Sequence, residues 1–400
     1  FILLEATNNM PEITGRICPA ICEYACVLGI NDDPVTIREN ELAIIEYAFK
    51  QGWVKPKKPA IRTGKRVAII GSGPAGIAVA GQLNKAGHSI TVFEKYNKIG
   101  GIMRYGIPDF KLEKWILDRR INILRKEGIK FITKTNVGHD YPSAKLIEEF
   151  DAVCFCGGSR APRDLKIDGR QLDGIYFALD YLIDANRAVS GESKSASIDA
   201  KNKNVVVIGG GDTGSDCVGL ANRQGARNVV QIELLPRPPE ERTKEYPWPM
   251  YPVILKTSSS HEEGCERYWS VLTKKFVDKD GKLKKLSCVE VRSEKDKNSG
   301  HYVMKEVPSS EFEIEADLAI IAVGFLHPEH KGFIEDINIK LDKRGNIKTD
   351  SNYMSSKPGI FSAGDAHSGQ SLIVKAVSEG RKAAHYIDLY LMGKTALPLL

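Results

Sequence analysis

Two glycine-rich turns, each preceded by a run of β-branched residues, constrain the fold of this chain more than any other feature. Residues 67–76 read VAIIGSGPAG, and residues 205–217 read VVVIGGGDTGSDC. Glycines at this spacing between a strand and a helix are typical of the Rossmann fold, in which the backbone of the turn approaches a pyrophosphate. The chain is therefore predicted to be an α/β protein with two Rossmann-like dinucleotide-binding domains.

The first turn has the spacing that a dinucleotide needs. Gly71 allows a tight turn off the strand, Gly73 lets the backbone approach the pyrophosphate, and Gly76 lets the following helix pack closely on the sheet. The phosphates are expected at the positive end of that helix. Glu94 stands 23 residues after Gly71, at the end of the next predicted strand, where a carboxylate can bind both hydroxyls of an adenosine ribose.

The second turn repeats this arrangement. Gly209, Gly211 and Gly214 have the same spacing, and Glu233 stands 24 residues after Gly209. Two dinucleotide sites in one chain indicate two electron carriers that exchange a hydride. A nicotinamide is released in each cycle, whereas a flavin can stay bound and pass electrons on singly.

Later segments are expected to complete a flavin site at the first turn. Gly101 follows Glu94 in a loop that can lie along the pyrophosphate. Near the C-terminus, a predicted strand ends at Gly364 and Asp365, and Asp365 is expected to bind a ribityl hydroxyl. The helix that opens at residues 370–372 can stabilise negative charge on the flavin pyrimidine ring with its N-terminus.

Three cysteines near the N-terminus are spaced four residues apart: Cys18, Cys22 and Cys26. A continuous helix would place these thiols along one face, although Pro19 disfavours a helix at the first of them. Spacing alone favours unpaired or buried thiols, because metal motifs usually contain C-x-x-C. The alternative is iron–sulfur ligation, for which thiolates are the usual ligands and to which Glu41 could add an oxygen.

The composition excludes several classes of protein. The chain has 400 residues, of which 42% are hydrophobic and 27% charged, as expected for a globular protein of two or three domains. Its net charge of +6 is dispersed, which argues against a nucleic-acid partner, and no run of eighteen apolar residues indicates a membrane span. We expect a cytoplasmic protein. Because the chain begins at Phe1 without Met, we also expect it to be part of a longer protein, in which an upstream segment could direct it to an organelle.

Local patterns predict how the chain is organised. A helical segment occupies residues 1–55, and a basic, proline-rich linker follows at 55–59. Strand–helix–strand patterns cover 66–94 and 204–235. Further strand or hairpin signals lie at 268–291, 318–323 and 359–363, and a last helix is expected from residue 371.

In combination, these motifs resemble one family. The stretches GRICPAICEYACVLGINDDPVTI, IGGIMRYGIPDFKL, IELLPRPP with YPWPMYP, and GQSLIVKAVSEGRKAA are similar to the small (beta) subunit of glutamate synthase and to the corresponding C-terminal region of the eukaryotic NADH-dependent enzyme. The resemblance covers nearly the whole chain and implies an adrenodoxin-reductase-like flavoprotein. Its parts would be a helical, Cys-containing segment and linker (1–61), a discontinuous FAD domain (62–170 plus 325–400) and an NAD(P)H domain (171–324).

The resemblance also implies which residues bind the cofactors. Those implied for FAD are Gly71, Gly73, Pro74, Ala75, Gly76, Glu94, Lys95, Gly101, Arg104, Ile107, Val137, Gly157, Gly364, Asp365, Gln370, Ser371 and Leu372. Those implied for NAD(P)H are Gly209, Gly211, Asp212, Thr213, Gly214, Glu233, Arg237, Arg242 and Gly324. Cys18, Cys22 and Cys26 match the family's iron–sulfur ligand positions, and Glu41 is a further candidate ligand, while the family's further cysteines fall before the first residue of this chain.

The implied reaction is a relay of electrons. A hydride passes from the nicotinamide to FAD, and electrons continue through 4Fe-4S clusters to an FMN in the synthase part, where 2-iminoglutarate becomes glutamate. The implied partner is the glutamate synthase large subunit or a covalently linked upstream synthase domain. This chain departs from the family at Lys375, where an aromatic residue is common.

The nicotinamide specificity is read from one loop. Glu233 favours a ribose with two free hydroxyls and repels a 2′-phosphate, whereas Arg237 and Arg242 could bind that phosphate. The stretch LLPRPPEER also resembles the eukaryotic NADH-type enzymes, so NADH is favoured over NADPH.

Three alternative functions are weighed against this one. A reductase module of another FAD/iron–sulfur enzyme, like that of dihydropyrimidine dehydrogenase or a ferredoxin reductase, would share the same motifs. A disulfide reductase would need a redox C-x-x-C near the flavin, and Cys154 and Cys156 are interpreted as core residues. A non-catalytic scaffold would be expected to have lost one glycine turn. His261, Cys265 and Cys288 match no common metal site.

Overall fold

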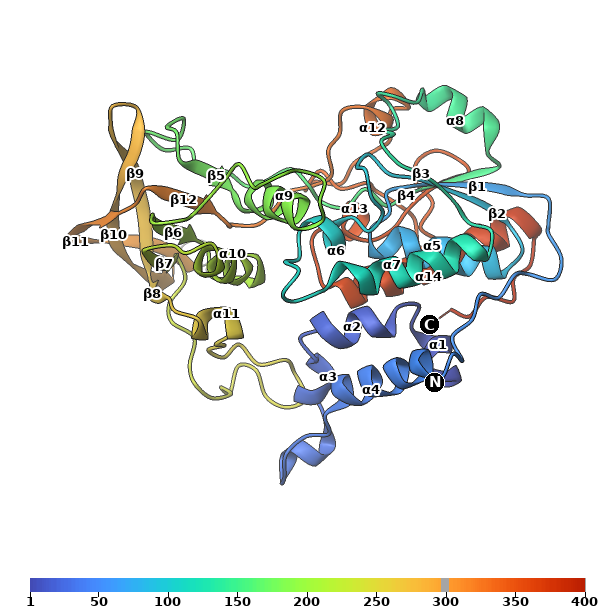
Figure 1. The fold of residues 1–400 in the computed structure, drawn as a ribbon, viewed down its shortest axis with the longest axis horizontal. Coiled ribbons are helices and arrows are strands. Elements are labelled where there is room, and N and C mark those ends of the chain that lie inside the picture. The colour runs from blue at the N-terminus through green and yellow to red at the C-terminus, as the bar shows by residue number, and fades with distance from the viewer. Residues whose placement is uncertain (296–301, 400) are drawn as a thin grey trace. The chain divides into compact units, whose positions relative to one another are not determined.

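The computed structural model describes residues 1–295 and 302–399, and the chain divides into two compact units (Figure 1). The first unit consists of Phe1–Tyr105, Asp109–Ala161 and Phe325–Leu400. The second consists of Gly106–Pro108 and Pro162–Gly324. Each unit contains one parallel sheet and one of the two glycine turns.

The first unit begins with short helices. They are α1 (Ile2–Thr7), α2 (Pro11–Ile17), α3 (Ile21–Tyr24), the 3-10 helix η1 (Val27–Ile30) and α4 (Ile37–Lys50). Helix α2 packs tightly on α4, because a Cβ on Gly15 would lie 2.9 Å from the Cβ of Leu42. The backbone is extended at Cys18 and left-handed at Ala20 (φ 54°). The three cysteines therefore do not share one continuous helix.

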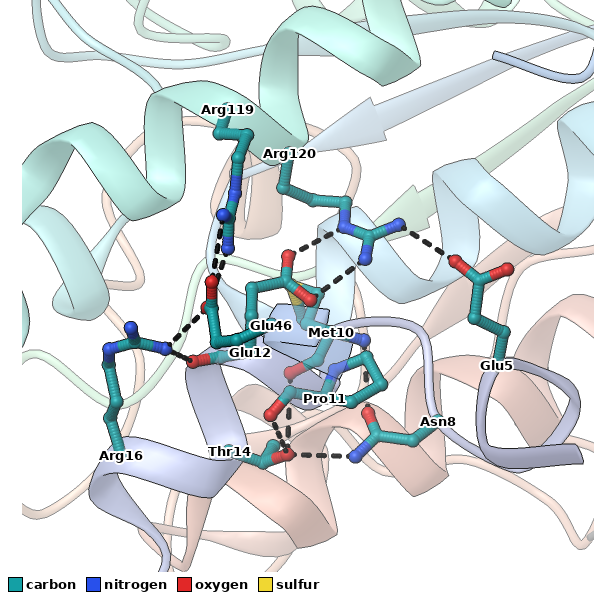
Figure 2. Close-up of polar contacts among 10 residues, drawn as sticks. All are labelled: Glu5, Asn8, Met10, Pro11, Glu12, Thr14, Arg16, Glu46, Arg119 and Arg120. Atoms are coloured by element: carbon teal, nitrogen blue, oxygen red, sulfur yellow. Dashed lines mark hydrogen bonds and ion pairs between the residues drawn. The ribbon is translucent and has the colours of Figure 1, made fainter. Parts of the chain in front are cut away.

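Two arginines of helix α7 (Lys114–Lys126) tie these N-terminal helices to the rest of the unit (Figure 2). Arg120 forms a two-bond ion pair with Glu12 of α2, at 2.7 and 2.8 Å. Arg119 pairs in the same way with Glu46 of α4, at 2.9 and 2.7 Å. The Cys-containing segment is thus fixed to the α/β core of its unit.

A five-stranded parallel sheet forms that core. Its order is β13-β4-β1-β2-β3, with bounds β1 (Arg66–Ile70), β2 (Ser89–Phe93), β3 (Lys130–Ile132), β4 (Ala152–Phe155) and β13 (Ile360–Ser362). Helix α5 (Pro74–Lys85) connects β1 to β2 and is buried almost throughout, because α14 (Ile373–Met392) packs on it. Gly380 makes this packing possible, since a Cβ there would lie 2.5 Å from the carbonyl oxygen of Ala75. The remaining helices are α6 (Ile102–Tyr105), α8 (Ser143–Glu149), α12 (Phe333–Asp336) and α13 (Asp365–Ser368).

The second unit has a parallel and an antiparallel sheet. The parallel sheet has the order β5-β12-β6-β7-β8, with bounds β5 (Ile175–Phe177), β6 (Asn204–Ile208), β7 (Asn228–Glu233), β8 (Glu266–Trp269) and β12 (Leu318–Ile321). Its helices are α9 (Ala178–Val189), α10 (Asp212–Arg223) and α11 (Ser259–Glu262). The antiparallel sheet has the order β11-β10-β9, with bounds β9 (Val271–Lys279), β10 (Lys282–Lys295) and β11 (Tyr302–Glu315).

The observed architecture confirms the predicted fold class. Both glycine turns join a central parallel strand to a helix, at β1–α5 and at β6–α10. The β-branched runs form these strands because the residues are buried on both faces of their sheets. Over the part of the chain that is described, no helix combines the length and the apolar character needed to cross a bilayer.

Candidate functional site

The first glycine turn is shaped by close backbone packing on two sides and is open on the third. Gly71 has a φ of 101°, and a Cβ there would lie 2.5 Å from the carbonyl oxygen of Cys156. A Cβ on Gly76 would overlap the carbonyl oxygen of Gly71. At Gly73, by contrast, no heavy atom of the described residues would lie within 4 Å of a Cβ. A ligand can therefore reach the backbone at Gly73, at the N-terminus of α5.

The second turn repeats this geometry residue by residue. Gly209 has a φ of 121°, and a Cβ there would overlap the carbonyl oxygen of Ala322. A Cβ on Gly214 would overlap the carbonyl oxygen of Gly209, as Gly76 does with Gly71. Gly211 again has no described heavy atom within 4 Å of a Cβ position and precedes α10, whose first residues are Asp212 and Thr213. Both turns leave space where a pyrophosphate would lie.

Each turn holds a carboxylate at the end of the neighbouring strand. Glu94 is only 4% exposed and accepts hydrogen bonds from the backbone N–H of Ser72 (3.2 Å) and of Tyr96 (2.9 Å). Glu233 accepts from the backbone N–H of Gly210 and of Leu235, the latter at 3.2 Å. Both carboxylates lie beside the turn where the ribose of a dinucleotide is expected.

Ser72 is a member of this site that the sequence patterns missed. Its hydroxyl donates to Glu94 and accepts from the backbone N–H of Gly100 at 2.9 Å. Ser72 thereby links the carboxylate to the loop that follows it. Its position inside the G-x-G triplet is the signal that could have indicated this role.

Two distant glycines also pack on the first turn. A Cβ on Gly101 (φ 53°) would lie 2.7 Å from the Cα of Gly73, and one on Gly364 (φ 72°) would lie 2.8 Å from the Cβ of Ala75. Gly157, in the loop after β4, is backed by the ring of Phe155. Glycine at positions 101 and 364 therefore lets these two loops approach the turn closely.

The last helix begins next to this group. Leu372 precedes α14, and the side chain of Gln370 donates to the carbonyl oxygen of Phe325 at 2.9 Å. Asp365 opens α13, and burial together with the nearby Glu379 raises the pKa of Asp365 to about 7. Glu379, which the sequence patterns did not single out, accepts from the backbone N–H of Gly364 at 3.0 Å and lies 3.8 Å from Lys375.

Other residues predicted for FAD have protein partners. Lys95 pairs with Glu329 at 2.7 Å, and burial lowers the pKa of Lys95. Arg104 is buried, pairs with Asp118 and donates to a backbone carbonyl, although its Nη1 has no hydrogen-bond partner within residues 1–295 and 302–399. Val137 is buried in a short bridge, and Ile107 belongs to the second unit.

The arginines near the second turn have partners within their own unit. Arg237 pairs with Glu240, and Arg242 donates to the carbonyl oxygens of Tyr246 (3.0 Å) and Met250. The backbone N–H of Arg163 donates to the carbonyl oxygen of Gly324 at 2.9 Å.

Arg267 and Trp269 were not predicted. The guanidinium groups of Arg237 and Arg267 lie 5.4 and 4.9 Å from the ring of Trp269, which is paired with Glu233 across the sheet.

His261 is linked to the second turn through one other side chain, that of Gln231. Its Nε2 lies 2.9 Å from the side-chain oxygen of Gln231, whose amide nitrogen donates to the carbonyl oxygen of Gly209 at 2.9 Å.

The cysteine segment and α14 line one cavity of 420 Å³. Cys18, Cys22 and Glu41 contribute from the N-terminal helices, and Val374, Val377, Ser378 and Arg381 contribute from α14. Burial and the neighbouring Cys18 raise the pKa of Cys22, and burial raises the pKa of Glu41. Cys26 does not line the cavity, and backbone N–H groups of Val35 and Leu28 lower its pKa.

The cavity contains two thiols, which are the usual ligands of an iron–sulfur cluster, and one carboxyl group. In the part of the chain that is described, no group of three His, Cys, Asp or Glu side chains lies close enough to hold one metal ion. An iron–sulfur cluster distributes its ligands over several iron atoms and takes thiolates. The eight cysteines are all free, and Cys154 and Cys156 are buried with their sulfurs 3.6 Å apart.

Two family patterns match the chain. The pyridine nucleotide-disulphide oxidoreductase family matches residues 65–380, and the family described as dihydropyrimidine dehydrogenase domain II, 4Fe-4S cluster, matches residues 1–53.

Curated relatives match over almost the whole chain. The glutamate synthase [NADPH] small chain of Mycobacterium tuberculosis (strain H37Rv) is 51% identical and covers 99% of this chain and 81% of the relative. The small chain of Bacillus subtilis is 45% identical, with 98% and 81% covered. The glutamate synthase [NADH] of Schizosaccharomyces pombe is 47% identical over 98% of this chain, which corresponds to 19% of that protein.

Solved structures share the fold at low sequence identity. The Mycobacterium tuberculosis FprA in complex with NADPH has a TM-score of 0.66 and 18% identity, with 82% of this chain and 85% of that chain covered. The thioredoxin reductase of T. acidophilum has a TM-score of 0.55 and 22% identity, with 82% and 99% covered.

Proposed function

The chain belongs to the glutamate synthase small-chain family within the pyridine nucleotide-disulphide oxidoreductases, and we propose that it is the flavoprotein module that feeds electrons to glutamate synthesis. It is an NAD(P)H-dependent oxidoreductase with FAD and NAD(P)H as cofactors. The observation that carries the proposal is the pair of glycine turns. Each opens at its middle glycine and holds a carboxylate beside it.

We assign FAD to segments 62–170 and 325–400. The N–H groups at the start of α5 would bind the pyrophosphate above Gly73, and Glu94 would bind the ribose. Asp365 would bind a ribityl hydroxyl, and the N-terminus of α14 would face the pyrimidine ring. Bound FAD accepts a hydride and can release its electrons one at a time.

We assign the nicotinamide cofactor to residues 171–324. Gly211 and the start of α10 would bind its pyrophosphate, and Glu233 its ribose. The protein's main contribution would be to hold the reduced nicotinamide at contact distance from the flavin, because hydride transfer between bound rings depends on proximity and orientation.

We propose NADH as the preferred donor. The carboxylate of Glu233 is held beside the turn by two backbone N–H groups, where it would repel a 2′-phosphate. Arg237 and Arg242, which could otherwise bind that phosphate, already pair with Glu240 and with loop carbonyls. Two relatives are named as NADPH enzymes and one as an NADH enzyme, so this choice rests on the Glu233 site.

The cysteine segment would hold iron–sulfur clusters. We propose that Cys18, Cys22 and Glu41, which share one cavity, ligate one cluster together with a thiolate from outside these 400 residues. Cys26, which lies outside that cavity, would serve a second cluster. These clusters would carry electrons to the large subunit or to a linked synthase domain, as the length of the Schizosaccharomyces pombe relative suggests.

The two turns can be tested separately in the 400-residue chain. Gly73→Val should abolish FAD binding, since a side chain there would occupy the pyrophosphate space, and Gly211→Val should keep FAD but prevent its reduction by NADH. Flavin content and anaerobic bleaching of the flavin spectrum measure both effects. Photochemical reduction of the Gly211→Val variant is the control for an intact flavin site. Full FAD content in Gly73→Val, or normal bleaching in Gly211→Val, would refute the assignment.

The chain alone should lack the synthase reaction. It should reduce ferricyanide with NADH and form no glutamate from glutamine and 2-oxoglutarate. Glutamate formation would show that the module assignment is wrong.

A further inference from the structure

A buried arginine connects the flavin-side helix to the cysteine segment. Arg381 of α14 is 3% exposed and donates to the side-chain oxygen of Asn9 and to the carbonyl oxygen of Ala6, both at 2.6 Å. Its Nε is buried and finds no hydrogen-bond partner among the described residues. Burial lowers the pKa of Arg381, but a guanidinium stays protonated in proteins. The site therefore holds a permanent positive charge that its partners, an amide and a carbonyl, do not neutralise.

This charge lines the cavity that contains the predicted cluster ligands. Three charged side chains line it: Arg38, Glu41 and Arg381. Arg38 donates to the carbonyl oxygen of Cys18 at 3.3 Å, but its side chain is 38% exposed and pairs with Glu39, so solvent and this carboxylate weaken its field. Arg381 is enclosed by protein, where charges are screened much less. Arg381 is therefore the buried cation of this cavity, and its charge should act on a bound anionic group with little screening.

The position of Arg381 along α14 separates it from the flavin end of the helix. Val374, the first cavity residue of α14, lies two residues after Leu372, a rise of about 3 Å. Arg381 lies nine residues after Leu372, or about 13 Å along the axis. One helix thus carries the predicted flavin contact at its start and this buried cation two and a half turns later. A change at Arg381 should act on the cavity rather than on the flavin.

We propose that Arg381 is a positioning residue that raises the reduction potential of an iron–sulfur cluster held by Cys18, Cys22 and Glu41. The inference rests on the proposed function, because it assumes the cluster in this cavity. In the step concerned, one electron would leave the reduced flavin and enter the cluster, and no bond to Arg381 would be made or broken. The added electron makes the cluster more negative, so a nearby buried cation favours the reduced form.

The effect is measurable as an equilibrium shift. Replacing Arg381 with Gln removes one charge while keeping a hydrogen-bonding side chain, and we expect the one-electron equilibrium between flavin and cluster to move about tenfold toward the flavin. For a one-electron couple this is a fall of about 59 mV in the cluster's potential. Arg381→Lys keeps the charge and should retain most of the wild-type potential.

The experiment uses the full-length protein and an EPR-monitored redox titration of the cluster. The matched control is Lys382→Gln, which removes the same charge from the next residue of α14, outside the cavity. We expect a lower cluster potential in R381Q alone, with unchanged flavin potential and NADH-to-ferricyanide activity. Thermal unfolding is followed in parallel, because a purely structural role would lower Tm in both Arg381 variants without moving the potential.

The outcomes are distinguishable. A cluster with the same potential in R381Q and wild type refutes this inference and leaves the proposed function standing. A wild-type protein without iron refutes the cluster assignment, and the inference falls with it. If R381Q loses its cluster, R381K decides: a potential near that of wild type supports the inference, and a fall of about tenfold in the equilibrium constant refutes it.

Discussion

Removing one partner of the ion pair between Glu12 and Arg120 should cost more stability than breaking an exposed pair such as Lys145–Glu149. Glu12 is completely buried and Arg120 is 7% exposed, and two hydrogen bonds of 2.7 and 2.8 Å join them (Figure 2). Glu5 lies 3.6 Å from the same guanidinium, and the carboxylates near Arg120 raise its pKa despite its burial. The guanidinium and the carboxylate therefore meet at a site where the protein covers both side chains.

Arg120→Met leaves Glu12 as a buried charge without its main partner. Such a change costs about 3–5 kcal/mol, because the carboxylate must be desolvated without compensation. Since folded domains are stable by about 5–15 kcal/mol, the loss should lower the unfolding midpoint in urea clearly. The double variant Glu12→Met/Arg120→Met should recover much of the loss, because replacing both partners with apolar groups is often neutral.

Equilibrium unfolding in urea, followed by circular dichroism and by flavin fluorescence, measures these changes. The control is Lys145→Met, which breaks an exposed pair with Glu149 (3.7 Å) and should change stability by less than about 0.5 kcal/mol. The reasoning is refuted if Arg120→Met costs no more than the control. It is also refuted if Glu12→Met/Arg120→Met is less stable than Arg120→Met by as much as one more unpaired buried charge would cost.

Two further predictions concern the carboxylates of the cofactor sites. Glu233→Ser should lower kcat/KM for NADH about ten- to hundredfold, because charge-assisted hydrogen bonds to the ribose are lost, and it should reduce the preference for NADH over NADPH. Steady-state reduction of ferricyanide with each donor measures this. An unchanged ratio of kcat/KM for the two donors would contradict the assignment. Asp365 has a folded pKa of about 7, above the usual value of about 4, so the folded state binds the proton more tightly. The stability of the FAD-free chain should therefore fall as pH rises from about 4 to 7. Urea titrations at several pH values measure this dependence, and Asp365→Asn should make it flatter. An equal dependence of stability on pH in both proteins would show that Asp365 is not the group responsible.

The strands that flank the two glycine turns could be predicted because their signals are local, whereas β3, β5 and β11 were not predicted. The run before Gly71 forms β1 at Arg66–Ile70, and the run before Gly209 forms β6 at Asn204–Ile208. A glycine turn between a strand and a helix specifies its own backbone path, since the first glycine needs a positive φ and the third needs to approach the first. The carboxylates Glu94 and Glu233 follow from the same local unit, because the next strand must end beside the turn.

The pattern around the cysteines was harder to interpret, because it depends on where the helix is interrupted. A spacing of four suggested one helical face, but the extended backbone at Cys18 and the left-handed Ala20 divide the segment into separate turns. As a result Cys18 and Cys22 line the cavity and Cys26 does not. Nothing in the spacing distinguishes the third cysteine from the other two.

Charged residues that are buried between distant segments could not be predicted at all. Glu12 and Arg120 are 108 residues apart, and Arg381 is 372 residues from Asn9. In the sequence each of them reads as an exposed polar position of a helix, since a local window cannot show a partner so far away. Their burial requires a partner of matching geometry, and that partner exists only once α7 and α14 have packed against the N-terminal helices. The contacts that join the cysteine segment to the α/β core of its unit are therefore long-range contacts, which no local window of the sequence can show.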